Sequence, residues 1–210
     1  LASELGCRRA LIVSDPGIQA AGHTARGQQA LRQAGIDSTV FGEFQANPTT
    51  ADVERGVAWA ADFRPDLIIG LGGGSSMDCA KGINFVHTGG GCMQDYWGGG
   101  KAAGPMLPMS AVPTTAGTGS EVTPYAVFID TKEKWKFGIN TEHNYPKLSL
   151  YDPLFLDSCT SGIYASAGMD AMTHTLESFV AKNATFYSRM FSRQAFRLLF
   201  LNLQKIATDD

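Results

Sequence analysis

Hydrophobic positions follow two different periods along the first two thirds of the chain. Short apolar runs are typical of buried strands, and between them apolar residues recur at the spacing of amphipathic helices. Turn residues separate these segments, as at Asp15-Pro16-Gly17 and Arg64-Pro65. The pattern predicts strands at 9–14, 38–41, 66–71, 109–112 and 148–151, and helices at about 19–34, 49–63 and 77–86.

Alternation of strand and helix is typical of β-α-β units, in which parallel strands form one sheet with helices on both faces. Two further apolar runs, at 125–130 and 135–139, flank Thr131-Lys132-Glu133-Lys134 and predict a β-hairpin. Glycine-rich residues 89–104 predict an irregular connection. The first part of the chain is therefore expected to be an α/β domain built on a parallel sheet.

The pattern changes to helix from about residue 161 onward, with no further strand signal. The final helix has an apolar face wide enough to require a packing partner, and little sequence remains to supply one. We therefore predict two domains: an α/β domain at 1–152, and the beginning of an all-α domain at 153–210. Because the chain opens directly into a strand and closes after this helix, we expect an internal piece of a longer protein.

Composition excludes several classes of function. The chain is 44% hydrophobic and 18% charged, with a net charge of −3 and no basic run, so nucleic acid is not an expected partner. No apolar run approaches the roughly 20 residues that span a bilayer. The four cysteines are widely spaced and form no CxxC motif, which favours reduced thiols in a cytoplasmic protein.

A glycine-rich stretch, Gly72-Gly73-Gly74-Ser75, leaves a predicted buried strand and enters a helix. Glycines allow the backbone to approach a pyrophosphate, and a helix N-terminus offers free N–H groups and a favourable dipole. The stretch differs from the G-x-G-x-x-G fingerprint because Met77 stands where the last glycine would be. The alternative is a tight turn in which Ser75 or Ser76 caps the helix.

Two other features suit a nucleotide but have structural alternatives. Asp15, after the first strand, could bind a ribose hydroxyl pair or cap the following helix, and the two roles can coexist. The hydroxyl-rich segment Pro113–Thr123, with sequence PTTAGTGSEVT, could hold phosphate or ribose oxygens, or could be a self-satisfied turn.

Asp170 and His174 lie four residues apart in a predicted helix, so both side chains leave one face. A carboxylate and an imidazole at that spacing can bind a divalent cation, although such a pair taken alone is more often a weak surface contact. Two ligands do not complete a site, since catalytic zinc sites take three protein ligands.

Taken together, these segments resemble the iron-containing (group III) alcohol dehydrogenases, which share a fold with glycerol dehydrogenase and dehydroquinate synthase. Residues 72–78 resemble the family's GGGSxxD loop, residues 113–123 its PTTAGTGSEVT segment, and residues 168–177 its GxDAxTHxxE helix. The resemblance covers essentially the whole chain in the family's order. The family completes its metal site with two further histidines downstream, and no histidine follows His174 in this sequence.

The resemblance implies a role for each matching residue. Asp15 would bind the adenosine ribose and favour NAD over NADP, and Asp170 and His174 would be the first two ligands of Fe²⁺ or Zn²⁺. The residues implied to approach the cofactor are Asp15, Asn47, Gly74, Ser75, Asp78, Thr114, Thr115, Thr118 and Lys136.

The activity implied is NAD-dependent, metal-assisted hydride transfer between small alcohols and aldehydes or ketones. The family's substrates run from simple alcohols through diols to lactaldehyde, so the substrate stays open, as do the choice of metal and homo-oligomer formation. Two alternatives remain: a catalytically silent dinucleotide-binding module with half a metal site, and a lyase of the dehydroquinate synthase type. The segment 113–123 argues for the dehydrogenase over the lyase.

Overall fold

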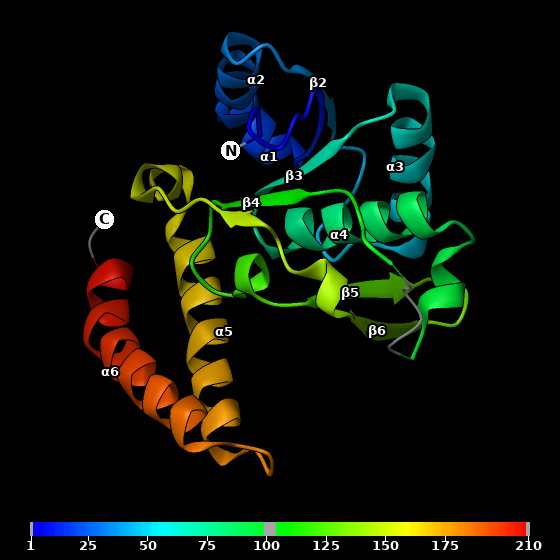
Figure 1. Cartoon of the computed structure of the whole chain (residues 1–210). Helices are drawn as coiled ribbons and strands as arrows, with labels where there is room; N and C mark the ends of the chain where they lie inside the picture. Colours follow the sequence, from blue (N-terminus) through cyan, green and yellow to red (C-terminus); the bar gives the residue numbers. More distant parts are fainter. Residues whose placement is uncertain (1, 99–103, 209–210) are drawn as a thin grey trace. The chain divides into compact units, whose positions relative to one another are not determined.

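The computed structural model describes residues 2–98 and 104–208. The chain divides into two compact units, one of residues 1–113 with 120–152, and one of residues 114–119 with 153–210. Figure 1 shows the strands of the first unit and the long helices of the second. The short segment 114–119 therefore belongs with the helical part of the chain, although β4 precedes it.

The first unit is built on a five-stranded parallel sheet with the order β2-β1-β3-β4-β7. Its central strands β1 and β3 are buried almost throughout, because helices cover the sheet and leave no solvent-facing side. The predicted parallel sheet is thus confirmed. The strand bounds are Arg9–Val13 for β1, Asp37–Phe41 for β2, Leu67–Gly72 for β3, Met109–Pro113 for β4 and Leu148–Ser149 for β7.

Helices lie on both faces of this sheet, as predicted (Figure 1). The chain moves one way along the sheet from β1 to β2 and the other way from β2 to β3 and β4. Right-handed crossovers therefore place the first two helices on one face and the next two on the other. These helices are α1 at Pro16–Ala20, α2 at His23–Gln33, α3 at Thr50–Phe63 and α4 at Gly74–Gly89.

Two helix predictions were wrong in detail. The single helix expected at 19–34 is two helices, because Gly22 adopts a left-handed conformation with φ of 80° and interrupts the hydrogen-bond ladder. Helix α4 begins at Gly74 instead of near Met77, so Ser75 and Ser76 lie inside the helix and do not cap it. Its N-cap residue is Gly73.

The ends of α3 follow the sequence signals closely. The Thr49 hydroxyl accepts a hydrogen bond from the Asp52 amide, and the Asp52 carboxylate accepts one from the Thr49 amide, which forms a capping box. At the other end Arg64, before Pro65, takes a left-handed conformation with φ of 54° and ends the helix.

The predicted hairpin forms a separate two-stranded antiparallel sheet of β5, Tyr125–Asp130, and β6, Trp135–Asn140. Phe128 and Phe137 of this hairpin pack with Phe85 of α4, so the hairpin shares the main hydrophobic core. The connection predicted at 89–104 contains a 3₁₀ turn at Met93–Tyr96. Residues 99–103 of that connection lie outside the described residues.

Helix α4 lies unusually close to its neighbours because glycines face the contacts. A Cβ atom on Gly82 would lie within 2.9 Å of the Phe128 ring and of Val53. A Cβ on Gly56 of α3 would lie 2.2 Å from Ile83, and one on Gly70 of β3 would lie 3.1 Å from the α4 backbone. Close contact of α4 with β3, α3 and β5 thus requires these three glycines.

The second unit consists of α5, Ser161–Val180, and α6, Phe186–Thr208, which pack against each other, preceded by a 3₁₀ turn at Pro153–Ser158. A Cβ on Gly168 of α5 would lie 2.3 Å from Leu203 of α6, so this glycine permits the close contact. The wide apolar face predicted for the last helix is present, and much of it is exposed. Of the predicted face, Phe191, Leu198 and Ile206 are exposed, whereas Ala195, Leu199 and Leu203 are half-buried. Other exposed apolar side chains of α6 are Phe186, Tyr187, Met190, Phe200 and Leu201.

Among the described helices, none is long and apolar enough to cross a membrane. All four cysteines are free thiols, with Cys7 and Cys79 buried.

Replacing Gly82 with Ala should destabilise the first unit by about 1–3 kcal/mol, because the added methyl overlaps Phe128 and Val53 in a packed core. The matched control is Gly27→Ala in the interior of α2, where the nearest atoms are 3.9 Å away. That change should be neutral or stabilising by about 0.5–1 kcal/mol. Urea unfolding followed by circular dichroism measures both, and equal effects would contradict the packing argument.

Candidate functional site

The glycine-rich loop between β3 and α4 meets the end of β1 at the carboxyl edge of the sheet. The Ser76 hydroxyl donates a hydrogen bond of 3.1 Å to Asp15 Oδ2. Gly72 has a φ of 146°, and a Cβ there would lie 2.3 Å from Ser76 Oγ and 3.2 Å from Asp15 Oδ2. Glycine at position 72 is therefore needed for this approach.

Asp15 has the structural role that the sequence left open. Its Oδ1 accepts hydrogen bonds from the amides of Gly17 and Ile18, so it caps α1. Its Oδ2 accepts one bond, from Ser76. A carboxylate oxygen accepts more than one hydrogen bond, so Oδ2 retains capacity for a ligand hydroxyl. Capping and ribose binding are thus compatible at this residue.

Asn47 links the start of α4 to the hairpin. Its amide donates a hydrogen bond of 3.0 Å to Ser75 Oγ, and its side-chain Oδ1 accepts one of 3.1 Å from the Lys136 ammonium. Asn47 has a positive φ of 56°, which asparagine tolerates better than most residues. The fold therefore brings together three of the predicted cofactor residues, Ser75, Asn47 and Lys136, from segments far apart in the sequence.

The N-terminus of α4 suits an anion. Its N-cap residue Gly73 makes no side-chain capping hydrogen bond, so no capping side chain occupies the first-turn amides at Gly74 and Ser75. The helix dipole and the exposed Lys136 ammonium, which reaches Asn47, both add positive potential there. This arrangement fits a phosphate group, as expected for the glycine-rich loop.

The Asp78 side chain of α4 binds Ser120 and Val127, and not the residues around Asp15. Its Oδ1 accepts a hydrogen bond of 2.7 Å from the Ser120 hydroxyl, and its Oδ2 accepts one of 3.1 Å from the Val127 amide. Burial raises the pKa of this carboxyl, against the opposing effects of the Ser120 bond and of nearby Lys81. Asp78 thus connects α4 to the end of the hydroxyl-rich segment and to β5.

Lys81 follows Asp78 by one helical turn and is completely buried. Its ammonium donates to the Ser120 carbonyl at 2.6 Å and hydroxyl at 2.9 Å, and to the carbonyls of Thr123 at 2.9 Å and Tyr125 at 2.7 Å. Burial lowers its pKa to about 8, although Asp78 and Glu121 oppose the shift.

Lys81 is not among the site residues predicted from the sequence. A usable signal was present: Lys81 is a charged residue within the apolar run Cys79-Ala80-Lys81-Gly82-Ile83, one turn after a motif aspartate. Buried charges require partners, and such a lysine predicts a hydrogen-bonded network inside the fold.

The threonines of the hydroxyl-rich segment fall in the second unit. Thr114 is fully buried and its hydroxyl has no hydrogen-bond partner in the described structure, while its carbonyl accepts a bond of 2.9 Å from the Cys159 thiol. Gly117 lies against Ala167 of α5, where a Cβ would come within 2.7 Å of the Ala167 carbonyl. Thr115 is half-buried and Thr118 is exposed. The buried Thr114 hydroxyl argues against a fully self-satisfied turn.

Asp170 and His174 lie together on α5 as their spacing predicts. Asp170 Oδ1 is 3.8 Å from His174 Nε2, and the side chains are 45% and 52% exposed. An oxygen and a nitrogen donor on one accessible face fit part of an Fe²⁺ or Zn²⁺ site. Within residues 2–98 and 104–208, however, no group of three or more potential His, Cys, Asp or Glu ligands is found.

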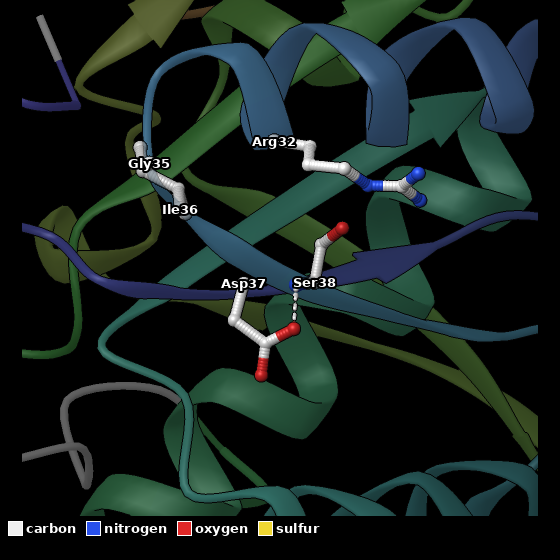
Figure 2. Close-up of a pocket in the computed structure, with 5 residues that line it drawn as sticks. All are labelled: Arg32, Gly35, Ile36, Asp37 and Ser38. Atoms are coloured by element: carbon white, nitrogen blue, oxygen red, sulfur yellow. Dashed lines mark hydrogen bonds between the residues drawn. The ribbon is translucent and has the colours of Figure 1, made fainter.

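One surface pocket lies elsewhere, at the turn from α2 into β2 (Figure 2). Figure 2 shows Arg32 and Asp37 at this pocket, with the Asp37 carboxylate accepting a hydrogen bond from the Ser38 amide. Because it lies at the amino end of β2, it faces the edge of the sheet opposite to Asp15 and the glycine-rich loop. It contains none of the predicted site residues.

Comparison with known proteins identifies the family. A family model described as iron-containing alcohol dehydrogenase matches residues 1–153. The chain belongs to the iron-containing alcohol dehydrogenase family. This confirms the resemblance, and it favours the dehydrogenase branch over the lyase branch of the shared fold.

Two characterised relatives illustrate the range of this iron-containing alcohol dehydrogenase family. The chain is 36% identical over 196 residues to an NAD-dependent methanol dehydrogenase of Bacillus methanolicus, covering 93% of this chain and 51% of the relative. It is 37% identical over 203 residues to a 1,3-propanediol dehydrogenase of Klebsiella pneumoniae, covering 96% and 52%. The chain thus spans about half the length of these relatives.

A solved structure of a 1,3-propanediol oxidoreductase superposes with a TM-score of 0.93 at 37% identity, covering 98% of this chain and 54% of that one. An alcohol dehydrogenase from Oenococcus oeni gives a TM-score of 0.94 at 29% identity, covering 99% and 55%. The α/β fold predicted from the sequence is therefore that of the family.

The lowered pKa of Lys81 predicts a specific pH dependence of stability. Between pH 8 and 10.5 the unfolded chain retains a lysine proton that the folded chain has released, so stability should rise with pH. Wild type should gain about 2–3 kcal/mol relative to Lys81→Met across this interval, since each pKa unit of the shift corresponds to about 1.4 kcal/mol and the group is only partly titrated at the two ends of the interval. Urea unfolding of both proteins at pH 7, 8.5 and 10 measures the difference. A constant difference would show that Lys81 does not titrate there.

Proposed function

We propose that the parent enzyme of this chain interconverts small alcohols and aldehydes or ketones by NAD-dependent, metal-assisted hydride transfer. The observation that carries the proposal is the N-terminus of α4, which no side chain caps. Asn47 connects this helix end to Lys136 by hydrogen bonds to Ser75 and to the Lys136 ammonium. The chain that contains this arrangement belongs to the iron-containing alcohol dehydrogenase family. The named activities of the methanol and 1,3-propanediol dehydrogenases support an alcohol as substrate. These relatives do not narrow the choice of alcohol further.

The proposed cofactor residues divide the dinucleotide between them. The amides of Gly74 and Ser75 would bind phosphate oxygens, with Lys136 supplying charge and Asn47 holding Lys136 in place. Asp15 would accept the ribose hydroxyls through Oδ2. Thr114, Thr115 and Thr118 would add hydroxyl and amide donors. Asp78 would contribute to cofactor binding indirectly, through its hydrogen bond to Ser120 in the hydroxyl-rich segment 113–123. When bound, NAD accepts or returns the hydride.

Asp170 and His174 would hold the metal, Fe²⁺ or Zn²⁺, through one carboxylate oxygen and one imidazole nitrogen. When bound, such an ion polarises the substrate oxygen as a Lewis acid. The contribution of α5 is to present both donors on one accessible face. We further propose that residues 153–210 are the beginning of the helical metal-binding domain.

The free cysteines support a cytoplasmic location, because reduced thiols are typical of that compartment. Homo-oligomer formation stays a prediction from the sequence.

Replacing Asp15 with Asn should reduce the preference for NADH over NADPH by about tenfold, or about 1.4 kcal/mol. Asparagine is an equally good N-cap, so α1 should remain capped, while the charge that repels a 2′-phosphate is removed. Fluorescence titration of the 210-residue chain with each nucleotide measures the two affinities. An unchanged ratio would remove Asp15 from the ribose role.

A hydride-transfer assay separates the dehydrogenase from the silent binding module. The 210-residue chain is mixed with NAD, an alcohol series and either Fe²⁺ or Zn²⁺, and NADH is followed by absorbance. Metal-dependent NADH formation that His174→Ala abolishes would support the dehydrogenase in this chain itself. NADH binding without turnover would support the module, and no binding of NADH would contradict both.

A further inference from the structure

Lys81 occupies a position from which it cannot serve as a ligand-binding group. Its side chain is completely buried, and four acceptor atoms lie between 2.6 and 2.9 Å from Nζ. An ammonium has three N–H groups, so one proton is shared between two of these acceptors and no donor is left for a cofactor. Its function must therefore be exerted through the groups that it holds.

Those groups all belong to one short stretch of chain. Lys81 binds Ser120, Thr123 and Tyr125, which cover the 3₁₀ turn at Ser120–Val122 and the first residue of β5. Three of the four acceptors are backbone carbonyls, so the interaction depends on the path of the backbone more than on the side chains. A backbone carbonyl left unpaired in this buried place would be costly.

Asp78 completes the attachment from the same face of α4. The Ser120 hydroxyl accepts a hydrogen bond from Lys81 and donates one to Asp78, so it bridges the two charged groups. Asp78 also accepts the Val127 amide, one step further along β5. The negative carboxylate near the ammonium lowers the cost of burying each charge.

The start of β5 leads into the hairpin whose second strand, β6, carries Lys136. Lys136 is paired with Ile129 of β5, and its ammonium donates to Asn47, whose amide donates to Ser75 at the start of α4. The hairpin is thus held at the start of β5 by Lys81 and Asp78, and at Lys136 by Asn47. Lys136 is one of the residues for which we propose a cofactor contact.

We propose that Lys81 is a positioning residue for NAD binding: with Asp78 it holds the turn at Ser120–Val122 and the start of β5 against α4, and thereby holds the hairpin that carries Lys136 beside the N-terminus of α4. The role in NAD binding rests on the proposed function. Asp78, whose two oxygens are both engaged inside the protein, acts in the same indirect way.

Hydrogen exchange and NADH affinity, measured on the 210-residue chain, test the proposal. Lys81→Met retains much of the aliphatic stem but removes all the donors. It should increase the exchange rate of amides in 120–127 by about tenfold and raise the NADH dissociation constant by about tenfold, the size of effect expected from losing one charged hydrogen-bond network.

Ile36→Ala is the matched control, because it removes a buried side chain from the separate core cluster of Cys7, Ala10, Ile36 and Leu67 while leaving every Lys81 partner in place. It should leave the exchange of 120–127 and the NADH dissociation constant within about twofold of wild type, at a temperature where both variants are folded. Loss of affinity in both variants alike would overturn the proposal, because general destabilisation would then explain it. Wild-type exchange at 120–127 in Lys81→Met would also overturn it.

Ser120→Ala provides a second, milder variant in case Lys81→Met does not fold. It removes the bridging hydroxyl but leaves Lys81 its three carbonyl partners. It should shift both measurements in the same direction by a smaller factor, and no shift in either would contradict the proposed attachment. If wild type itself fails to bind NADH, the proposed function and the cofactor part of this inference both fall, whereas the exchange measurements still decide whether Lys81 holds the turn.

Discussion

The close approach of α4 to its neighbours is the constraint on which the rest of the first unit depends. Gly70 of β3, Gly56 of α3 and Gly82 of α4 itself each face a contact where a Cβ would overlap neighbouring atoms. This spacing places the N-terminus of α4 beside Asp15 and Asn47, and brings its middle against β5. A wider spacing would separate the phosphate-binding end from the strands whose loops support it.

The first half of α4 therefore contains two chemically different regions. Its uncapped first turn is exposed to anions and is supported by Ser75, Asn47 and Lys136. One turn later, Asp78 and Lys81 lie in a buried network in which donors and acceptors are used inside the protein. The first arrangement leaves hydrogen-bonding capacity for a ligand, and the second consumes it. This difference separates binding residues from positioning residues within one motif.

The second unit contains two candidate metal ligands and many exposed apolar side chains. Asp170 and His174 are accessible and lie on one face of α5, yet within the described residues no third ligand joins them. Apolar side chains along α6, such as Phe186 and Phe200, are likewise largely exposed. The chain spans about half the length of its relatives, and Asp170 and His174 supply two donors on one face of α5.

The sequence by itself determined the order of strands and helices, the capping box of α3, the hairpin and the motifs that indicate the family. These features depend on residues close together in the chain, so periodicity and local turn chemistry suffice to predict them. The sequence did not predict the break at Gly22 or the start of α4 at Gly74, because a glycine can continue, end or begin a helix and its backbone angles decide among these.

Only the tertiary structure decided which side chains meet across the fold. The hydrogen bond from Lys136 to Asn47, and the buried set formed by Lys81, Ser120 and Tyr125, join segments that no local pattern relates. A buried charge is tolerated only where several partners converge, and that convergence depends on how the sheet, the helices and the hairpin pack together. The sequence therefore identified the family, whereas packing decided which charged residues of α4 can act on a ligand and which act on the protein.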